Sequence, residues 1–132
     1  MTMKQIKYMA ATLLIFFVMA VVFLMWIFSG ERPKSYFSNY KEAKASGIMD
    51  RGWIPTFIPK SATNINEQHD LDTNWVKMIF NYAPDDIDIT RLTCNSELVI
   101  ENGIEFKCEY FSSNVIIRLF EDGKAELHSS PN

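Results

Sequence analysis

The sequence is poor in the residues that most enzymes and metal sites need. It has only two cysteines, two histidines and five glycines among 132 residues. A catalytic metal centre needs two or three converging His, Cys, Asp or Glu ligands, usually with imidazole among them. Nucleophilic catalysis needs a Ser, Cys or Thr beside a positioned base, and the sequence has neither a Gly-x-Ser-x-Gly elbow nor a glycine-rich phosphate loop. We therefore expect a protein without catalytic activity and without a cofactor.

Basic residues are scarce in the part of the chain that follows residue 30. Residues 31–132 hold eleven Lys and Arg against sixteen Asp and Glu, a net charge of −5. An acidic surface without a basic stripe is a poor match for the phosphates of nucleic acid. A nucleic-acid partner is therefore not expected, and another protein is.

The longest apolar run, from Met9 to Phe28, contains no charge, proline or glycine. About 20 apolar residues, at ~1.5 Å rise each, match the ~30 Å hydrocarbon core of a bilayer. A cleaved signal peptide has a shorter apolar region that ends in small residues, whereas this one ends in Trp26, Ile27 and Phe28. The predicted organisation is a short basic tail over 1–8, a transmembrane helix in the lipid bilayer over 9–29, a linker over 30–35 and a soluble domain over 36–132.

The orientation of this span in the membrane has two conflicting indications. Two lysines precede the span and four basic residues follow it within about 16 residues, which by the positive-inside rule does not favour export. Cys94 and Cys108 indicate the opposite, because an even cysteine count in a small exported domain suggests a disulfide. Two free buried thiols in the cytosol are the alternative. We expect a Cys94–Cys108 disulfide and a periplasmic domain anchored in a bacterial inner membrane.

The first half of the domain changes from helix to turn to strand signals. Tyr36, Tyr40 and Ala43 recur at helical spacing before Gly47, which predicts a short helix over 36–46. The prolines at 55 and 59 exclude a helix there, so an extended ribbon lying across or beside a sheet is expected. Residues 63–82 predict two strands around a turn. One face of the second strand carries Val76, Met78, Phe80 and Tyr82.

Two short pairs predict hairpins in the last third. Asn102-Gly103 and Asp122-Gly123 separate runs of alternating apolar residues. With Asn102-Gly103 as the turn, Cys108 would lie opposite Glu97, and Cys94 would reach it only from the end of a preceding helix or from the loop after it. The expected elements are a helix over 85–93 and strands over 97–101, 104–111, 115–120 and 124–128. The predicted fold is α+β: one N-terminal transmembrane helix, then a small domain with an antiparallel meander sheet of about five or six strands and two short helices.

The most distinctive polar side chains lie between residues 51 and 74. Glu67 and His69 share a strand face and could supply half of a zinc site, but an exposed polar strand face is the plainer interpretation. The stretch is either a structural brace or a recognition surface. The candidate binding residues are Trp53, Glu67, His69, Asp70, Asp72 and Asn74.

Three motifs in the same stretch resemble a pattern found in small bacterial proteins of unassigned activity. They are Gly52-Trp53-Ile54-Pro55, then Ile58-Pro59-x-Ser61-Ala62, then Ile65-x-Glu67-x-His69-x-x-Asp72-Thr73-Asn74. Many of these proteins are membrane-anchored. The resemblance covers about 25 residues and the apolar strand after them, implies a shared fold core, and brings no catalytic residues.

Three functions follow as hypotheses. The first is an envelope protein that binds another protein, such as an immunity or inhibitor protein or an accessory subunit. The second is a sensor or carrier of a small ligand or metal at the face formed by Glu67 and His69. The third is an enzyme with an unrecognised site.

Overall fold

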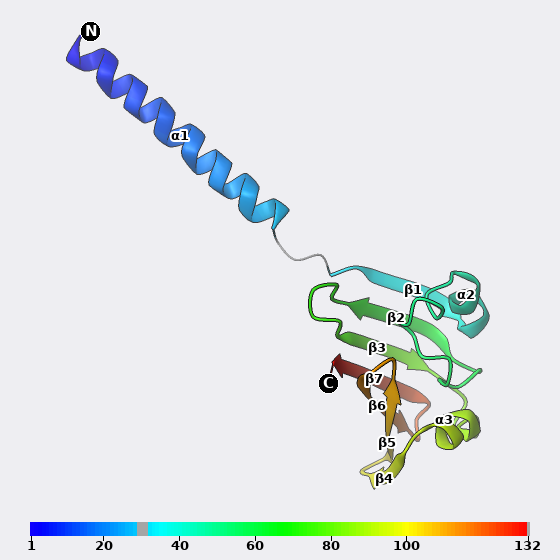
Figure 1. Cartoon of the computed structure of the whole chain (residues 1–132). Coiled ribbons are helices and arrows are strands. Elements are labelled where there is room, and N and C mark those ends of the chain that lie inside the picture. The colour runs from blue at the N-terminus through cyan, green and yellow to red at the C-terminus, as the bar shows by residue number, and fades with distance from the viewer. Residues whose placement is uncertain (29–31, 132) are drawn as a thin grey trace. The chain divides into compact units, whose positions relative to one another are not determined.

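The computed structural model describes residues 1–28 and 32–131. The chain divides into two compact units, Met1–Gly30 and Glu31–Asn132. The first unit is helix α1 (Met3–Ile27) (Figure 1). A capping box starts it: the Thr2 hydroxyl accepts from the Gln5 amide, and the Gln5 side chain accepts from the Thr2 amide.

Helix α1 is long and apolar enough to cross a membrane, and none of its residues is buried. These are the properties of a membrane anchor or a signal sequence. Most of the tail expected over 1–8 is helical, because the capping box extends the helix back to Met3. The expected linker is also shorter than predicted: residues 29–31 lie outside the described residues, and Lys34 and Ser35 already belong to a strand.

The second unit is an α+β domain built on one seven-stranded sheet, with every described strand pair antiparallel. The strand order is β1-β2-β3-β7-β6-β5-β4, so the last strand lies between the two halves of the domain (Figure 1). The elements are β1 (Lys34–Asn39), α2 (Tyr40–Ala45), β2 (Thr63–His69), β3 (Val76–Asn81), α3 (Asp88–Thr93), β4 (Ser96–Ile100), β5 (Gly103–Tyr110), β6 (Ser113–Phe120) and β7 (Lys124–Pro131).

The core joins one face of this sheet to the segment 46–62 and the two short helices. Buried apolar side chains from β2, β3, β5, β6 and β7 form one cluster with Ala43 of α2 and with Ile54, Phe57 and Ile58. The predicted apolar face of residues 76–82 is confirmed, since all four of its side chains are buried in this cluster. The predicted α+β class is confirmed as well, with one strand more than expected.

The additional strand is β1, where helical spacing had predicted the start of a helix. Residues 34–39 pair with β2, with Phe37 opposite Ile65. The Asn39 side chain then accepts from the Glu42 amide and starts α2, which ends before Gly47 at φ 76°. Only the second half of the predicted helix forms, because pairing with β2 satisfies the backbone of the first half.

The segment 46–62 is a series of turns, and the prediction of an extended ribbon is wrong. The amide of Trp53 donates to the carbonyl of Ile48, and the carbonyls of Pro55 and Pro59 accept from amides three residues later. Proline lacks an N–H but keeps its carbonyl, so it can open a turn.

The first C-terminal hairpin turns one residue earlier than its Asn-Gly pair predicts. Ile100 lies opposite Gly103, so Glu101 and Asn102 form the turn and Cys108 does not face Glu97. Gly103 is needed for packing: a Cβ there would lie 2.3 Å from the Leu119 carbonyl oxygen of β6. In the second hairpin Gly123 does occupy the turn, at φ 82°.

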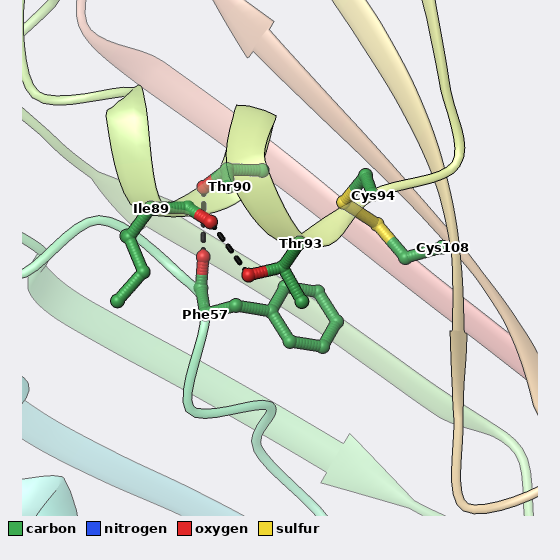
Figure 2. Close-up of a disulfide and its surroundings, with 6 residues drawn as sticks. All are labelled: Phe57, Ile89, Thr90, Thr93, Cys94 and Cys108. Atoms are coloured by element: carbon green, nitrogen blue, oxygen red, sulfur yellow. Dashed lines mark hydrogen bonds between the residues drawn. A yellow bond between two sulfur atoms is a disulfide. The ribbon is translucent and has the colours of Figure 1, made fainter.

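The predicted disulfide between Cys94 and Cys108 is present. Cys94 is the residue after α3, and its partner lies in the middle of β5. Figure 2 shows the same helix held a second time, by the Thr90 hydroxyl donating to the buried Phe57 carbonyl at 2.7 Å. The short helix α3 is therefore attached to both the sheet and the segment 46–62.

Candidate functional site

A groove of about 430 Å³ opens at one end of the sheet. Three segments that are distant in sequence meet there: the turns around Gly52, the β2–β3 loop at Asn74 and the β5–β6 hairpin, with the end of β7 beside them. Its lining combines aromatic, hydroxyl, amide and guanidinium groups. The lining residues are Arg51, Gly52, Trp53, Asn74, Tyr110, Phe111, Ser112, Ser113, Ser129 and Pro131.

The backbone around this groove is in the left-handed region at four positions. Asn74, Phe111 and Ser112 have φ angles of 55°, 47° and 60°, and Gly52 has 82°. For residues other than glycine this conformation costs roughly 1–2 kcal/mol, and asparagine tolerates it best. Backbone strain of this kind concentrates at functional sites, where the surrounding structure holds it in place.

The clearest example of this backbone strain is the hairpin between β5 and β6. Tyr110 lies opposite Ser113, so Phe111 and Ser112 are the two residues of a type I′ turn. Such turns usually carry Asn-Gly, because both residues need positive φ. The sequence instead places a phenylalanine there, and its side chain is 73% exposed.

Contacts below the Phe111 ring fix its position. The ring lies over Gly52, where an added Cβ would be 3.2 Å from Cδ2 of the phenylalanine. Tyr110 packs edge-on against the same ring at a centroid distance of 4.5 Å, and its hydroxyl donates to the Met49 carbonyl at 3.4 Å. The exposed Phe111 ring is therefore held in place by its contacts with Gly52 and Tyr110.

Behind the groove lies a buried polar stack. The indole of Trp53 and the imidazole of His69 are stacked with centroids 3.9 Å apart and an interplanar angle of 14°. The Nδ1 atom of His69 is 2.6 Å from Oε1 of Glu67, whose residue is only 2% exposed. Both side chains lie on the core-facing side of β2, beside Ile65.

The electrostatics of this stack depend on Glu67. Burial raises the pKa of its carboxyl group, while the interaction with His69, a hydrogen bond with the Ser35 side chain and the positive charge of Arg51 oppose that increase. Its Oε2 atom has no hydrogen-bond partner in the part of the chain that the structure describes. His69 therefore contributes a hydrogen bond that compensates for burial, and it also supports the Trp53 ring.

Asp70 shapes the loop that presents Asn74 to the groove. Its Oδ1 accepts from the amides of Asp72 and Thr73, and its carbonyl accepts from the Asn74 amide. Oδ2 of the same side chain lies 3.3 Å from the guanidinium of Arg32. The hydrogen bonds from the loop amides lower the pKa of Asp70, with a further contribution from Arg32.

The structure separates the candidate residues predicted from the sequence. Trp53 and Asn74 line the groove, whereas Glu67 and His69 lie behind it. Asp70 is buried in the loop and Asp72 is exposed on it. The interpretation of Glu67 and His69 as an exposed polar face is wrong, because that face of β2 points into the core. Across residues 1–28 and 32–131, no three His, Cys, Asp or Glu side chains come together as metal ligands.

Sequence reasoning missed Arg51, Tyr110 and Phe111. A usable signal was present in the hairpin: Phe111-Ser112 separates two strands without the glycine or asparagine that a tight turn prefers. A turn with unsuitable residues marks a position where local turn preference does not explain the sequence.

Comparison with known families gives one match. The YbbD head domain family matches residues 31–81, which contain β1, α2, the segment 46–62, β2 and β3. Trp53, Glu67, His69 and Asn74 lie within the matched part, and the hairpin with Phe111 lies beyond it. No curated protein and no solved structure matches the chain.

Proposed function

We propose that this chain is a single-pass protein of the bacterial envelope whose folded domain binds another protein through the aromatic groove, without catalysis. The observation that carries the proposal is an exposed phenylalanine held in a strained turn, against a glycine, beside Trp53 and Arg51. Tryptophan, tyrosine and arginine are the residues that most often dominate the energy of protein interfaces. An immunity or inhibitor protein and an accessory subunit are forms that this function can take.

The composition of the groove supports a binding role over a catalytic one. Three serine hydroxyls line it, from Ser112, Ser113 and Ser129. A serine nucleophile needs a general base within hydrogen-bond distance. Among the described residues that line the groove there is no His, Asp or Glu. The hydroxyls are suited to accept and donate hydrogen bonds to a partner.

Membrane attachment and export complete the proposal. Helix α1 supplies the anchor, and the disulfide between Cys94 and Cys108 fits an oxidising compartment such as the periplasm. The basic residues on both sides of the span do not decide the orientation, and long domains cross the membrane largely regardless of such charges.

The test compares two exposed aromatic residues. Phe111→Asn places a residue that tolerates positive φ in the turn, so the domain should keep its stability while losing the ring. Tyr36→Asn is the matched control, since Tyr36 is 57% exposed on β1 and does not line the groove. Full-length protein, solubilised in detergent, is used to capture partners for quantitative mass spectrometry. We expect a partner captured by the wild type and by Tyr36→Asn, and at least ~10-fold depleted with Phe111→Asn, which corresponds to ~1.4 kcal/mol. Equal capture by both variants contradicts the proposal.

A small ligand is the second candidate, because the groove volume falls within the ~300–1,000 Å³ range of ligand sites. A ligand would then contact Trp53 and Arg51 and leave Glu67 and His69 behind the indole. A metabolite that raises the unfolding temperature of the wild type but not of Phe111→Asn, with no protein captured, would favour this function instead.

A further inference from the structure

A second surface, separate from the aromatic groove, lies at the β4 edge of the sheet. β4 is the last strand in the sheet order, so it pairs with β5 on one side, and on the other side no strand of the described residues pairs with its backbone. Such an edge is a template for pairing with another chain. Leu98 and Val99 on this strand are 56% and 79% exposed, and Leu92 of the neighbouring helix α3 is 87% exposed.

The two edges of the sheet differ in how they are protected. β1, at the opposite edge, contains Lys34 and directly follows Pro33, two residues that discourage edge pairing. β4 contains no lysine and no proline, and its one charged side chain, Glu97, is already bound. Arg91 holds both oxygens of this carboxylate, with Nε–Oε2 and Nη2–Oε1 distances of 2.8 and 3.0 Å. Neutralised in this way, Glu97 does not deter a strand from pairing with β4.

An apolar groove of about 320 Å³ opens on one face of the sheet and reaches this edge at Val99. Val99 lies opposite Ile104 of β5, which lies opposite Leu119 of β6, so Val99 is at the outer end of the groove, and a strand added to β4 would place alternate side chains there. The disulfide fixes Cys94, two residues before β4, to the middle of β5, which holds the edge in place. The other lining residues are Tyr82, Pro84, Ile87, Gly103, Ile104, Leu119 and Glu121.

The charges around the groove select the occupant. Glu121 lines it, Asp85 and Asp88 flank the lining segment, and Glu101 follows β4; all four are exposed. The nearby Arg91 is bonded to Glu97, and Asp88 interacts with the same guanidinium only through its charge. A second copy of this acidic domain would bring the same carboxylates to the edge, and like charges facing each other are unfavourable. A cationic segment would be attracted.

We propose that the β4 edge binds an extended segment of another protein that alternates apolar residues with lysine or arginine. The segment adds an eighth strand to the sheet and places its apolar side chains beside Val99, on the face that holds the groove. Its cationic side chains point to the opposite face, and the acidic groups around the groove attract them through the electrostatic field of the domain rather than by direct contact. This site is independent of the aromatic groove, and the two can bind different parts of one partner or two different proteins.

The experiment uses full-length protein in detergent and a short, end-capped, fluorescent peptide that alternates valine and lysine. Fluorescence anisotropy should show binding of this peptide that weakens as salt is added, and at least ~10-fold weaker binding of the corresponding valine–glutamate peptide. A valine–lysine peptide N-methylated along one edge should also lose binding, because it cannot donate hydrogen bonds to β4.

Two substitutions at one exposed position test whether the peptide binds at β4, while the N-methylated peptide, which keeps its charges, separates strand pairing from general charge attraction. Val99→Lys places a charge on the edge and should weaken binding of the valine–lysine peptide at least ~10-fold, whereas Val99→Thr should not. Phe111→Asn should leave this binding unchanged, so failure here is distinguishable from failure of the aromatic groove. An intact disulfide and an unchanged unfolding temperature verify that each variant is folded. The proposal is overturned if Val99→Lys or N-methylation has no effect, or if a dimer that Val99→Lys dissociates forms in place of peptide binding.

Discussion

At the residue scale, the buried pair of Glu67 and His69 shows how one side chain can serve a site that it does not line. Oε1 of Glu67 orients the imidazole through a 2.6 Å contact, and the imidazole supports the Trp53 ring at 3.9 Å. A neutral replacement of the carboxyl group would keep the shape of this support and remove its charge. The effect of Glu67 is therefore best seen as a pH dependence of stability.

We expect Glu67→Gln to change how stability varies with pH. Burial raises the pKa of Glu67 above its unfolded value, so its protonated form is the one that folding favours. The stability that this group contributes is fully present below the unfolded pKa and is lost as pH rises through the folded pKa. Relative to the wild type, Glu67→Gln should therefore become more stable as pH increases from ~4 to ~8.

The measurement is urea unfolding of both proteins across this pH range, with the exposed Glu109→Gln as a control. Asp70 acts in the opposite direction, because its hydrogen bonds lower its pKa and its contribution is lost as pH falls. Parallel stability curves for Glu67→Gln and the wild type would show that the buried carboxyl group is not the source of the dependence.

At the scale of elements, the β4–β5 hairpin shows a glycine whose role depends on a third strand. Gly103 pairs with Ile100 on one side and with Phe120 on the other. A side chain at this position would point at the Leu119 carbonyl oxygen, 2.3 Å from its Cβ. From the sequence, a turn preference would explain this glycine, but the register puts the turn at Glu101 and Asn102 and leaves packing against β6 as the reason.

Gly103→Ala should destabilise the domain by about 1–3 kcal/mol, because the contact is with backbone that cannot move aside easily. Asn102→Gly, in the adjacent turn position at φ 61°, should change stability by less than ~0.5 kcal/mol. Midpoints of urea unfolding for both variants and the wild type provide the comparison. The packing role of Gly103 is refuted if the alanine is tolerated as well as the turn substitution.

At the scale of the whole molecule, helix α1 and the disulfide together predict the membrane topology. If the domain is exported and α1 remains in place, Cys94 and Cys108 should react with a maleimide in intact cells only after reduction. A cysteine introduced at the exposed Ser38 should be labelled from outside by an impermeant reagent, while one at Thr2 should not. The protein should also retain an N-terminal tag and stay in the membrane fraction.

Two results would contradict this topology. Loss of the tag from mature protein would show that α1 is a cleaved signal sequence. Free, reactive thiols at Cys94 and Cys108, together with an unlabelled cysteine at Ser38, would place the domain in the cytoplasm.

Much of the fold could be predicted because its signals are local. The apolar run predicts α1, alternation predicts β3 and the four C-terminal strands, and the distribution of cysteines in a small acidic domain predicts the disulfide. The predictions fail where contacts with residues distant in the sequence determine the local structure. Residues 34–39 form β1 because β2 is available to pair with them.

The candidate site likewise contains some residues that the sequence predicts and others that it does not. Trp53 and Asn74 stood out by residue type and neighbourhood, and both line the groove. Arg51, Tyr110 and Phe111 did not stand out, because no local sequence pattern indicates that a hairpin near residue 111 contacts a turn near residue 52. The unusual residues of the turn are visible in the sequence, but its strain is established only by its φ angles.

The amino-acid sequence alone determined one apolar helix of membrane-spanning length and an acidic α+β domain, and it favoured a bond between Cys94 and Cys108. These properties follow from composition and from short-range periodicity, which need no knowledge of distant contacts. The tertiary structure alone decided which polar residues are buried, where the aromatic groove forms and which sheet edge stays open. Those features depend on strand order and register, and a register is set by all the strands packing together.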